Sequence, residues 1–378
     1  MKIGIDTFAC NAGISGVGVY LKQILKRIPP SGALYELFGW EFDRYAYGEA
    51  SEKDMNFVAR CRFNGRTANS LWHMVRYKEF ALSRCYNACF FPAAHRRLPS
   101  GSPCPTIGTI HDMAAYWGTS KTRAHLGAVL RLMLPDSLRK LDRVIAVSSW
   151  VRQELIEVAH VRESRIDVVP NGVDLDAFKV HPHYDDREIL IKPFGFKRPY
   201  ILYAGRLNHP IKNHTGLIKA FEIFKERTKF PHRLVLAGSD DNGSDKIKQT
   251  ALSSCCRTDI FLTGPFPSDS LPDLYSNADM VVIPSFYEGF GQSAIEAMAA
   301  GIPVACARAA SLPETAEHAA LYFDPHDPED MADRMVTLAT NHEIAGQCRQ
   351  AGILRAKDFS WDLCAARTLR IIQDMASQ

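Results

Sequence analysis

Two cations flank a loop in the second half of the chain, at a place where a strand is expected to give way to a helix. Arg206 follows the expected strand 200–204 directly, and Lys212 precedes the expected helix 213–227. Cationic side chains beside the free N–H groups of a helix start bind phosphate groups well. The spacing therefore predicts a clamp for a diphosphate, and the alternative is two unrelated surface cations in one loop.

Two carboxylates bracket a glycine-rich segment, EGFGQSAIE, that follows the expected strand 280–284. Glu288 and Glu296 could accept hydrogen bonds from the hydroxyl groups of one bound ligand. A capping box offers a purely structural explanation for Glu296, because Ser293 precedes it by three residues at an expected helix start. Glu288 has no such explanation. The backbone N–H groups that could meet phosphate or sugar oxygens are those of Gly289, Phe290, Gly291 and Gln292.

The first half of the chain holds another glycine-rich turn, GISGVG at residues 13–18, between the expected strand 2–8 and an amphipathic helix. Glycines allow backbone N–H groups to approach a ligand closely. The turn predicts a contact with a phosphate or a sugar, unless it is only a flexible connection. His111 ends the expected strand 105–111, and the sequence alone favours a buried histidine there. We expect the other histidines at the surface, among them His95, His209 and His214.

Strands and helices alternate through both halves, which predicts an α/β fold of two doubly wound, Rossmann-like domains facing each other across a cleft. The N-terminal domain is expected over 1–180 and the C-terminal domain over 181–360, with a linker in the proline-containing stretch 174–199. A last helix within 361–378 is expected to pack back on the N-terminal domain. The expected strands are 2–8, 34–40, 57–63, 87–93, 105–111, 143–148, 166–169, 200–204, 233–237, 259–263, 280–284 and 303–307. The expected helices of the second half are 213–227, 268–277, 293–300 and 328–340.

The composition excludes several classes of protein. Of the 378 residues, 46% are hydrophobic and 23% are charged, as in ordinary globular domains and unlike disordered chains. The mean hydropathy is −0.15, and no stretch has the roughly 18 uncharged apolar residues of a membrane-spanning helix. Ten cysteines without a CxxC pair indicate reduced thiols and a cytoplasmic protein. Because neither GxGxxG nor GxxxxGKS/T occurs, a simple NAD-binding or P-loop domain is not expected.

Charge is distributed unevenly, although the net charge is only +3. Residues 1–170 contain 23 Lys and Arg against 15 Asp and Glu, and the remainder contains 22 against 27. Such an imbalance indicates an anionic partner for the first half, and the alternative is the moderate charge imbalance that is common between domains. No nucleic acid partner is expected.

The basic excess concentrates in the segment 60–97, where apolar residues lie among the cations. We expect this segment to contact an anionic membrane surface, unless its apolar residues enter the core and the cations only coat a solvated face. Its basic residues are Arg60, Arg62, Arg66, Arg76, Lys78, Arg84, Arg96 and Arg97. Its interleaved apolar residues are Leu71, Trp72, Val75, Phe80 and Leu82.

Together these motifs resemble those of the retaining GT-B glycosyltransferases of family 4, which use nucleotide-sugar donors. Two glutamates separated by seven residues are the signature of that family, and Glu288 and Glu296 match it. Further segments that resemble the family are IHD at 110–112, VVPNGVD at 168–174, GRLNHPIKN at 205–213 and EAMAAGIPV at 296–304. The segment that begins at Leu138 with LRKLDRVIAVSSW is similar to bacterial mannosyltransferases of surface-polysaccharide pathways.

The resemblance implies a role for each candidate residue of the second half. Arg206 and Lys212 would hold the donor diphosphate and stabilise its charge as the glycosidic bond breaks. Glu288 would bond the hydroxyl groups of the donor sugar, and Glu296 would bond the nucleotide ribose. Phe266 would lie against the base. The neighbouring residues that would complete the nucleotide-sugar site are Gly289, Phe290 and Gly291.

Two candidates of the first half acquire roles in the same way. His111 would contact the donor sugar near its anomeric carbon, through its ring or its backbone, and Gly16 would line the sugar and phosphate end. One departure from the family lies at Gln292 and Ser293, where apolar residues or proline are more usual. This departure concerns the local contacts with the donor sugar and leaves the fold unaffected.

The resemblance finally implies the reaction. It indicates a retaining transfer of a hexose, mannose from GDP-mannose, to a lipid-linked or oligosaccharide acceptor in polysaccharide biosynthesis. No metal or other cofactor is expected, and the protein would work in the cytoplasm, peripherally at the inner face of the plasma membrane. The alternatives are a UDP- or dTDP-sugar donor, a sugar-nucleotide 2-epimerase of the same fold, and a non-catalytic protein that binds a nucleotide sugar.

Overall fold

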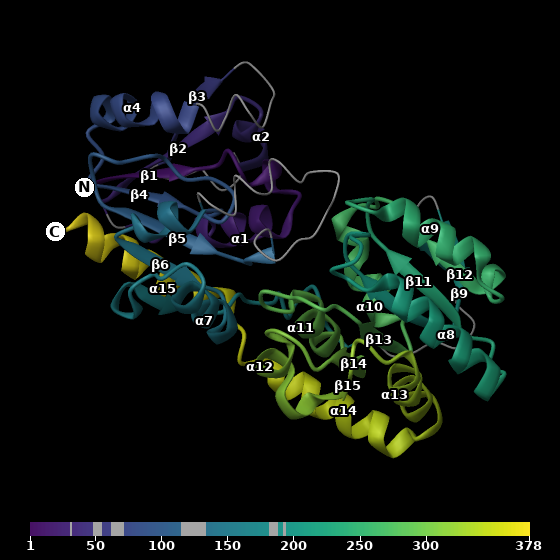
Figure 1. Ribbon diagram of the computed structural model, residues 1–378. Helices are drawn as coiled ribbons and strands as arrows, with labels where there is room; N and C mark the ends of the chain where they lie inside the picture. The colour runs from purple at the N-terminus through teal and green to yellow at the C-terminus, as the bar shows by residue number, and fades with distance from the viewer. Residues whose placement is uncertain (31, 48–54, 62–71, 115–133, 181–187, 192–193) are drawn as a thin grey trace. The chain divides into compact units, whose positions relative to one another are not determined.

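The computed structural model describes residues 1–378 except 31, 48–54, 62–71, 115–133, 181–187 and 192–193 (Figure 1). The chain forms two compact units: unit 1 comprises Met1–Gly172 and Trp361–Gln378, and unit 2 comprises Val173–Ser360. The first boundary therefore precedes the expected position at 180. The reason is that Val173 already pairs with unit 2, because its N–H donates to the carbonyl of Phe359 at 3.1 Å.

Unit 1 is built on a parallel sheet of seven strands in the order β3-β2-β1-β4-β5-β6-β7. The strands are β1 (Lys2–Asp6), β2 (Leu34–Trp40), β3 (Met55–Cys61), β4 (Ala88–Phe91), β5 (Thr106–Ile110), β6 (Arg143–Ala146) and β7 (Ile166–Val168). Strands β4 and β5 are buried along their whole length. Such strands need helices on both faces of the sheet, which explains their nearly continuous apolar sequences.

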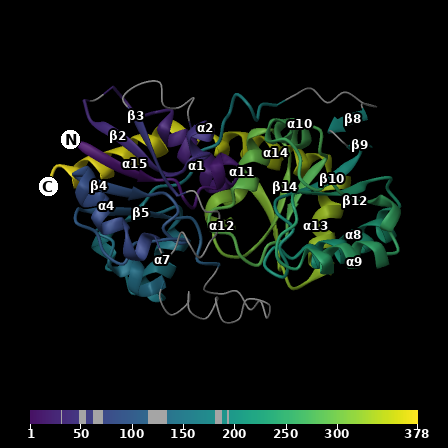
Figure 2. The same ribbon diagram turned by 90° about the horizontal axis from the view of Figure 1, so that it is seen from above.

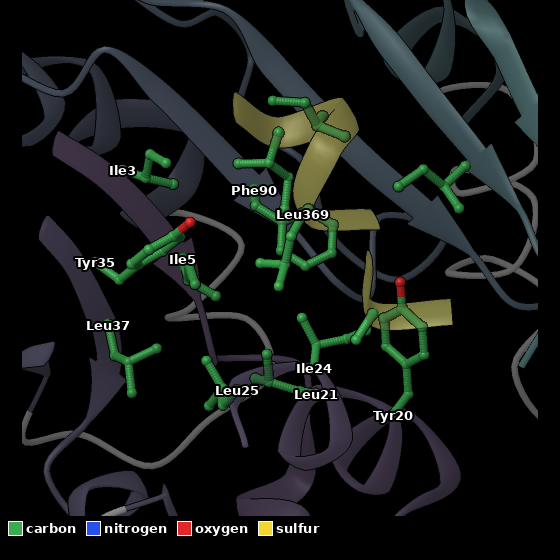
Figure 3. Close-up of a cluster of buried hydrophobic side chains, with 14 of the residues drawn as sticks. Ile3, Ile5, Tyr20, Leu21, Ile24, Leu25, Tyr35, Leu37, Phe90 and Leu369 are labelled. Atoms are coloured by element: carbon green, nitrogen blue, oxygen red, sulfur yellow. The ribbon is translucent and has the colours of Figure 1, made fainter. Parts of the chain in front are cut away.

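The helices of unit 1 include the one that closes the chain. Those described are α1 (Gly16–Leu25), α2 (Asp43–Tyr47), α4 (Tyr77–Arg84), α7 (Ser149–Glu157) and α15 (Trp361–Ala376), with short 3₁₀ turns η1 (Asn11–Gly13) and η4 (Glu163–Arg165). Helix α15 packs against α1, β4 and β5. Figure 3 shows the resulting core, in which Leu369 of α15 lies among Leu21 and Ile24 of α1 and Phe90 of β4. The last helix is therefore part of the core of unit 1.

Unit 2 has a parallel sheet of six strands in the order β12-β11-β10-β13-β14-β15. Figure 2 labels β10, β12 and β14 of this sheet. The strands are β10 (Tyr200–Ala204), β11 (Arg233–Ala237), β12 (Ile260–Leu262), β13 (Met280–Ile283), β14 (Val304–Ala307) and β15 (Ala320–Phe323), and a separate antiparallel hairpin is formed by β8 (Glu188–Ile191) and β9 (Phe194–Lys197). The helices are α8 (His214–Thr228), α9 (Ser244–Ser253), α10 (Leu271–Ser276), α11 (Gln292–Ala299), α12 (Leu312–Ala316), α13 (Pro328–Thr340) and α14 (His342–Ala356), with 3₁₀ turns η5 (Arg257–Asp259), η6 (Ser268–Ser270) and η7 (Glu317–Ala319). Both units thus have the expected doubly wound α/β architecture.

Each sheet reverses its winding at one place. In unit 2 the chain passes from β10 through α8 and α9 towards β12, and then winds from β13 to β15 in the opposite direction. Because β10 and β13 are neighbours, the loops that follow them diverge at the carboxyl edge of the sheet and leave room for a ligand. In unit 1 the neighbouring strands β1 and β4 have the same arrangement.

All twelve expected strands are present to within a few residues, but several elements were not expected. The stretch 174–199 is not a plain linker, because it contains the hairpin of β8 and β9. Strand β15 and helices α9 and α14 were also missed. The buried positions of α14 are Cys348, Gly352 and Ala356, which are four residues apart but small. A helix face made of such residues carries little hydrophobic signal in the sequence.

The glycine-rich turn before α1 is packed tightly at one glycine and is open at another. A Cβ on Gly18 would lie 2.4 Å from the carbonyl oxygen of Cys10 and 2.5 Å from the Cα of Gly13. These are backbone atoms that cannot move away cheaply. A Cβ on Gly16 would meet no atom within 4 Å. The helix itself starts at Gly16 because the hydroxyl of Ser15 accepts the N–H of Gly18 at 3.3 Å.

This difference predicts opposite results for two alanine variants. Gly18→Ala should lower the free energy of unfolding by about 1–3 kcal/mol, because the added methyl group forces backbone atoms apart. Gly16→Ala should leave it unchanged or raise it by up to about 1 kcal/mol, because alanine is the better residue within a helix. Urea unfolding of both variants measures this, and an equal loss in the two would contradict the described packing.

Candidate active site

The candidate residues of unit 2 gather at the point where its sheet reverses. Arg206 and Lys212 lie in the loop after β10, and Ser285 and Glu288 lie in the loop after β13. A backbone hydrogen bond joins the two loops, from the N–H of Phe286 to the carbonyl of Ile211 at 2.9 Å. The sequence-predicted cations and the first predicted glutamate are therefore brought together at the carboxyl edge of the sheet.

Both oxygens of the Glu288 carboxylate are held by side chains. Lys212 Nζ lies 2.6 Å from Oε2, and the hydroxyl of Ser285 donates to Oε1 at 2.7 Å. The ion pair is largely shielded, with 25% of the lysine side chain and 15% of the glutamate side chain exposed. Each carboxylate oxygen has a second lone pair. The group can therefore still accept hydrogen bonds from the hydroxyls of a ligand while its position is fixed.

Two hydroxyl groups hold the loop that carries Glu288 by donating hydrogen bonds to its backbone carbonyls. The backbone carbonyl of Glu288 accepts the hydroxyl of Ser311 at 2.8 Å, and that of Phe290 accepts the hydroxyl of Thr315. The side chain of Phe290 is buried with its ring 5.5 Å from that of Phe359, so only its backbone could touch a ligand. Gly291 has a φ of +94° and precedes α11, a conformation that favours glycine.

Arg206 differs from Lys212 in its exposure. Its guanidinium forms an ion pair with Asp241 at 3.0 Å, and 61% of its side chain is exposed. Asn208 also donates to this carboxylate at 3.2 Å. Ion pairs of such exposed groups contribute little to stability, typically about 0–1 kcal/mol. The guanidinium can therefore exchange Asp241 for a phosphate group at a small cost in free energy. Arg206 is thus held loosely, whereas Lys212 is held firmly by Glu288.

Glu296 does not form the capping box that the sequence suggested. Helix α11 begins at Gln292 after Gly291, so Ser293 lies inside the helix, and no side chain caps its start. Glu296 is half-buried within the helix, and burial raises the pKa of its carboxyl to about 7, against the counteracting effects of Gln292 and Tyr275. A capping role therefore does not explain the presence of Glu296. Its carboxyl group instead ionises near neutral pH.

The last candidate of unit 2, Phe266, follows a strand that lies two positions from β10 in the sheet. Phe266 is half-buried in the loop after β12, and the order β12-β11-β10 separates it from the loop of Arg206 by one strand. Loops after β10, β11 and β12 all leave the same edge of the parallel sheet. An aromatic side chain at this edge could pack against a flat ring at one end of a ligand that extends along the loops.

The two candidates of unit 1 lie at the carboxyl edge of its own sheet. Gly16 is the exposed first residue of α1, which follows β1, and His111 follows β5 and is half-buried. His111 Nε2 lies 3.0 Å from the carbonyl oxygen of Pro92, and its ring is 4.8 Å from that of Tyr20. Burial, followed by the nearby His95 and Arg96, lowers the pKa of His111 to about 3.

These contacts determine how His111 can act. At neutral pH its ring is uncharged and carries one N–H. A carbonyl only accepts hydrogen bonds, so that hydrogen is assigned to Nε2. Nδ1 is then an acceptor that could receive a hydrogen bond from a hydroxyl group. The expectation of a buried histidine at this strand end is correct in part, because the ring is half-buried and also retains one acceptor.

Comparison with known proteins identifies the family. A family model described as Glycosyltransferase Family 4 matches residues 14–177, and one described as Glycosyl transferases group 1 matches residues 186–355. A D-inositol 3-phosphate glycosyltransferase of Corynebacterium jeikeium is 30% identical over 72% of this chain and 67% of its own. The chain belongs to the group 1 glycosyltransferases of family 4.

Other similar proteins extend along the whole chain. The O-antigen chain mannosyltransferase B of Escherichia coli is 28% identical to this glycosyltransferase over 98% of both chains. The Anabaena protein HepE, solved in complex with UDP and glucose, has a TM-score of 0.72 at 18% identity and covers 99% of this chain and 100% of its own, which shows a shared fold. The chain spans little more than half the length of two further curated relatives.

Several residues at the site of this glycosyltransferase were not found by sequence reasoning. Asp241 lies in the loop after β11, four residues beyond the strand end at Ala237, and was not singled out. Ser285 was noticed only as part of a motif. Buried Tyr203 lies beside Ser285, and burial and Glu288 keep its pKa well above the ordinary value.

The expected surface position is wrong for several histidines. His214 is fully buried with its ring 4.4 Å from that of Tyr203, and His95 is buried beside Arg96. Burial first, then Lys212 and His209, lowers the pKa of His214 to about 3, so the ring stays neutral behind the site. A histidine at a helix start or strand end gives no sequence signal for whether its ring turns inward.

Two further features concern metals and membranes. In the part of the chain that the structure describes, no cluster of three or more His, Cys, Asp or Glu side chains could hold a metal ion, and no helix is long and apolar enough to cross a membrane. Asp174 and Asp176 are close in sequence, but the carboxylate of Asp174 is engaged in a turn, where it accepts the N–H groups of Asp176 and Ala177.

The hydrogen bond from Ser285 to Glu288 generates a first prediction for the site. Ser285→Ala should reduce kcat by about ten-fold or more, because a hydrogen bond to a charged group is worth about 1.5–3 kcal/mol and here it orients the carboxylate. The matched control is Ser254→Ala, which removes a similar, partly buried hydrogen bond, from Ser254 to Glu222 at 2.5 Å, away from the site. Equal kcat in the two folded variants would contradict the positioning role of Ser285.

The raised pKa of Glu296 generates a second prediction. The folded protein keeps the proton to about pH 7, whereas the unfolded chain loses it near the ordinary value of 4.5. The unfolded state then binds fewer protons in this window, so the contribution of Glu296 to stability falls as pH rises from 4.5 to 7 and is constant above it. Relative to wild type, Glu296→Gln should therefore gain free energy of unfolding over this window, measured by urea unfolding at several pH values. A difference that does not vary with pH would show that the carboxyl is not perturbed.

Proposed function

We propose that this glycosyltransferase transfers mannose from GDP-mannose to a glycan or lipid-linked acceptor, with retention of configuration and without a metal ion. The observation that carries the choice of mannose is the match along the whole chain with an O-antigen chain mannosyltransferase. The nucleotide-sugar donor is supported by the cations and carboxylates at the sheet reversal of unit 2. The acceptor is assigned to unit 1 because its half of the chain carries the basic excess.

The diphosphate of the donor is proposed to bind Arg206 and Lys212. Before binding, the two cations are neutralised by Asp241 and Glu288. The exposed guanidinium of Arg206 leaves Asp241 for the phosphate, whereas Lys212 stays against Glu288 and reaches the phosphate from a fixed position. Both cations then stabilise the negative charge that develops on the leaving diphosphate. Fixed cations of this kind take the place of a divalent metal in the proposed mechanism.

The remaining contacts are proposed from the roles that the family resemblance implies. Glu288, held on both oxygens, accepts hydroxyl groups of the donor sugar, and the backbone of Gly289 to Gly291 faces the sugar and phosphate. Glu296 accepts the ribose hydroxyls, and Phe266 lies against the base. Neutral His111 accepts a hydrogen bond from the sugar through Nδ1, and Gly16 lines the phosphate end without a side chain.

Donor and reaction class are tested together. Because a ligand at about 100 times its dissociation constant stabilises by roughly 2.7 kcal/mol, thermal melts with GDP, UDP and dTDP identify the base. GDP-mannose is then incubated with and without a mannosyl-oligosaccharide acceptor, in excess chelator. Acceptor-dependent transfer in chelator supports the proposal. Stabilisation by UDP or dTDP alone, mannose epimerised without acceptor, binding without turnover, or loss of activity in chelator restored by magnesium would each contradict part of it.

The proposed role of the cations predicts large effects on turnover. Arg206→Ala and Lys212→Ala should each lose about 2.7–4 kcal/mol of transition-state stabilisation, by analogy with the removal of an oxyanion-hole donor. Stability should change little for Arg206→Ala, because its ion pair is exposed. Arg227→Ala is the matched control, since Arg227 also lies in exposed ion pairs, with Glu329 and Asp333, on α8. Near-normal kcat in folded Arg206→Ala protein would remove that residue from the mechanism.

Only some residues of the segment 60–97 are exposed enough to contact a membrane. Of the cations predicted between 60 and 97, Arg84 is engaged by buried Glu36, and Arg96 donates to the carbonyl of Ala9. Phe80 enters the core, and Trp72 is half-buried. Arg62, Arg66 and Leu71 lie outside the described residues. The exposed residues along α4 also include Ser83 and Glu79, and the carboxylate of Glu79 pairs with Arg76 at 3.3 Å. The exposed apolar and basic residues at the start and along α4 are Met74, Val75, Arg76, Lys78 and Leu82, hereafter the α4 face.

We propose that the α4 face holds the enzyme at an anionic membrane, where a lipid-linked acceptor resides. Half or more of each of Met74, Val75 and Leu82 is exposed, at 50%, 60% and 56%. Such side chains can enter the interfacial layer of a bilayer, and each nearby cation adds about 1 kcal/mol on an anionic leaflet. The apolar groups and the charges then act on the same surface.

Liposome sedimentation tests this contact. The protein should bind anionic vesicles at low salt, bind less as salt rises, and lose binding when Arg76 and Lys78 are changed to glutamate. Lys219→Glu, on an exposed residue of α8 in unit 2, is the control and should bind as wild type does. Equal sedimentation with neutral and anionic vesicles, or with none, would rule out the α4 face as an electrostatic membrane contact.

A further inference from the structure

Two cysteine side chains touch in unit 1, away from the residues assigned to the reaction. Cys89 is the second residue of β4, and Cys104 lies shortly before β5. Their sulfur atoms are 3.7 Å apart. Cys89 is buried, whereas Cys104 is partly exposed. Because the backbones of β4 and β5 are paired here, with the N–H of Cys89 donating to the carbonyl of Pro105 at 2.9 Å, the two sulfurs are held beside one another.

The surroundings make the two thiols chemically unequal. The contact with Cys89 first, and then the hydroxyl of Ser102, lower the pKa of Cys104 to about 7. The Ser102 oxygen lies 3.6 Å from the Cys104 sulfur. Burial raises the pKa of Cys89 well above its ordinary value. At neutral pH the pair therefore contains one thiolate-prone sulfur and one protonated sulfur.

The thiolate-prone sulfur is also the one that a small molecule can reach. Cys104 lines a hollow of about 180 Å³ together with Gly101, Ser102, Lys140 and Asp142. A hollow of this size admits a reagent as small as a hydroperoxide, and buried Cys89 lies behind Cys104 on its inner side. An accessible thiolate backed by a second thiol is the arrangement of an oxidation-sensitive pair.

We propose that Cys104 is a site of oxidation by hydroperoxides and that Cys89 resolves the product to an intramolecular disulfide. The Cys104 thiolate attacks one peroxide oxygen, the O–O bond breaks, and the leaving oxygen departs as hydroxide or alkoxide. The Cys89 thiol then attacks the resulting sulfenic acid, an S–S bond forms, and water leaves with the Cys89 proton. Two electrons pass from the two thiols to the peroxide.

Other cysteines that the structure describes lack one of these features. Cys10, Cys306, Cys348 and Cys364 are buried. Cys255 and Cys256 also lie close, with sulfurs 3.8 Å apart, but burial first, and then contact with Cys255, raise the pKa of Cys256 to about 11. Cys85 is exposed, and its sulfur lies 3.6 Å from the carbonyl of Leu82. Cys85 is therefore a suitable exposed control, and the pair of Cys255 and Cys256 is an internal comparison.

The test treats the whole reduced protein with hydrogen peroxide at neutral pH. Remaining thiols are alkylated, and peptides are mapped without reduction. The peptide of Cys89 should be joined to that of Cys104, with loss of both alkylation sites. Cys104→Ser should abolish the link, and Cys85→Ser should leave it unchanged. In Cys89→Ala the sulfenic acid of Cys104 should persist and be captured by dimedone.

A second readout does not depend on the disulfide. The rate at which iodoacetamide modifies Cys104 should rise with pH to a half-maximum near 7 in wild type, and this midpoint should move upward in Cys89→Ala, because the lowering contact is removed. Two results would overturn the proposal. One is an unlinked Cys104 after peroxide treatment that oxidises other cysteines, and the other is a Cys104 midpoint that Cys89→Ala does not move.

Discussion

The ion pair between Lys212 and Glu288 joins the two loops on which the candidate site depends. Each residue follows a different strand of the same sheet, and the sheet reverses its winding between these strands. A shielded charge left alone would be costly, so each loop stabilises the other only in this arrangement. The hydroxyl of Ser285 and the backbone bond from Phe286 to Ile211 hold the same junction. The carboxylate is thereby positioned before any ligand arrives.

This junction also explains why the site can hold two cations without a bound anion. Lys212 and Arg206 are each neutralised by a carboxylate, but the two pairs are unequal. The pair of Lys212 is shielded and shares its glutamate with Ser285, whereas the pair of Arg206 with Asp241 is largely exposed. An arriving diphosphate therefore meets one fixed cation and one that can change partner. In such an arrangement Lys212 orients the diphosphate, and Arg206 can move to follow the charge that develops on the leaving group.

Much of this could be predicted from the sequence, because it depends on local patterns. Strands followed by polar or glycine-rich turns located Arg206, Lys212 and Glu288 at strand ends, and parallel strands bring such ends to one edge. Partners across the sheet could not be predicted in the same way. Asp241 meets Arg206 because β11 lies beside β10, and strand order is not written in local periodicity.

The burial of single side chains was also poorly predicted, where no periodic pattern of neighbouring residues indicates the direction of the side chain. The sequence placed His214 at the surface, yet its ring is packed on Tyr203. The capping box at Ser293 and Glu296 failed for a related reason, since α11 starts at Gln292, two residues too early for Ser293 to be its cap. Element bounds that shift by one or two residues leave a fold unchanged but reverse such assignments.

The central claim is that Lys212 and Glu288 act as one unit on the donor. A double-mutant cycle of kcat/KM tests it most directly, with Lys212→Ala, Glu288→Gln and the double variant. If they act together, the double variant should be little worse than the worse single variant, and the coupling free energy should be on the order of 1–3 kcal/mol. Additive losses in folded protein would show that the ion pair only stabilises the two loops, and would contradict this account of the site.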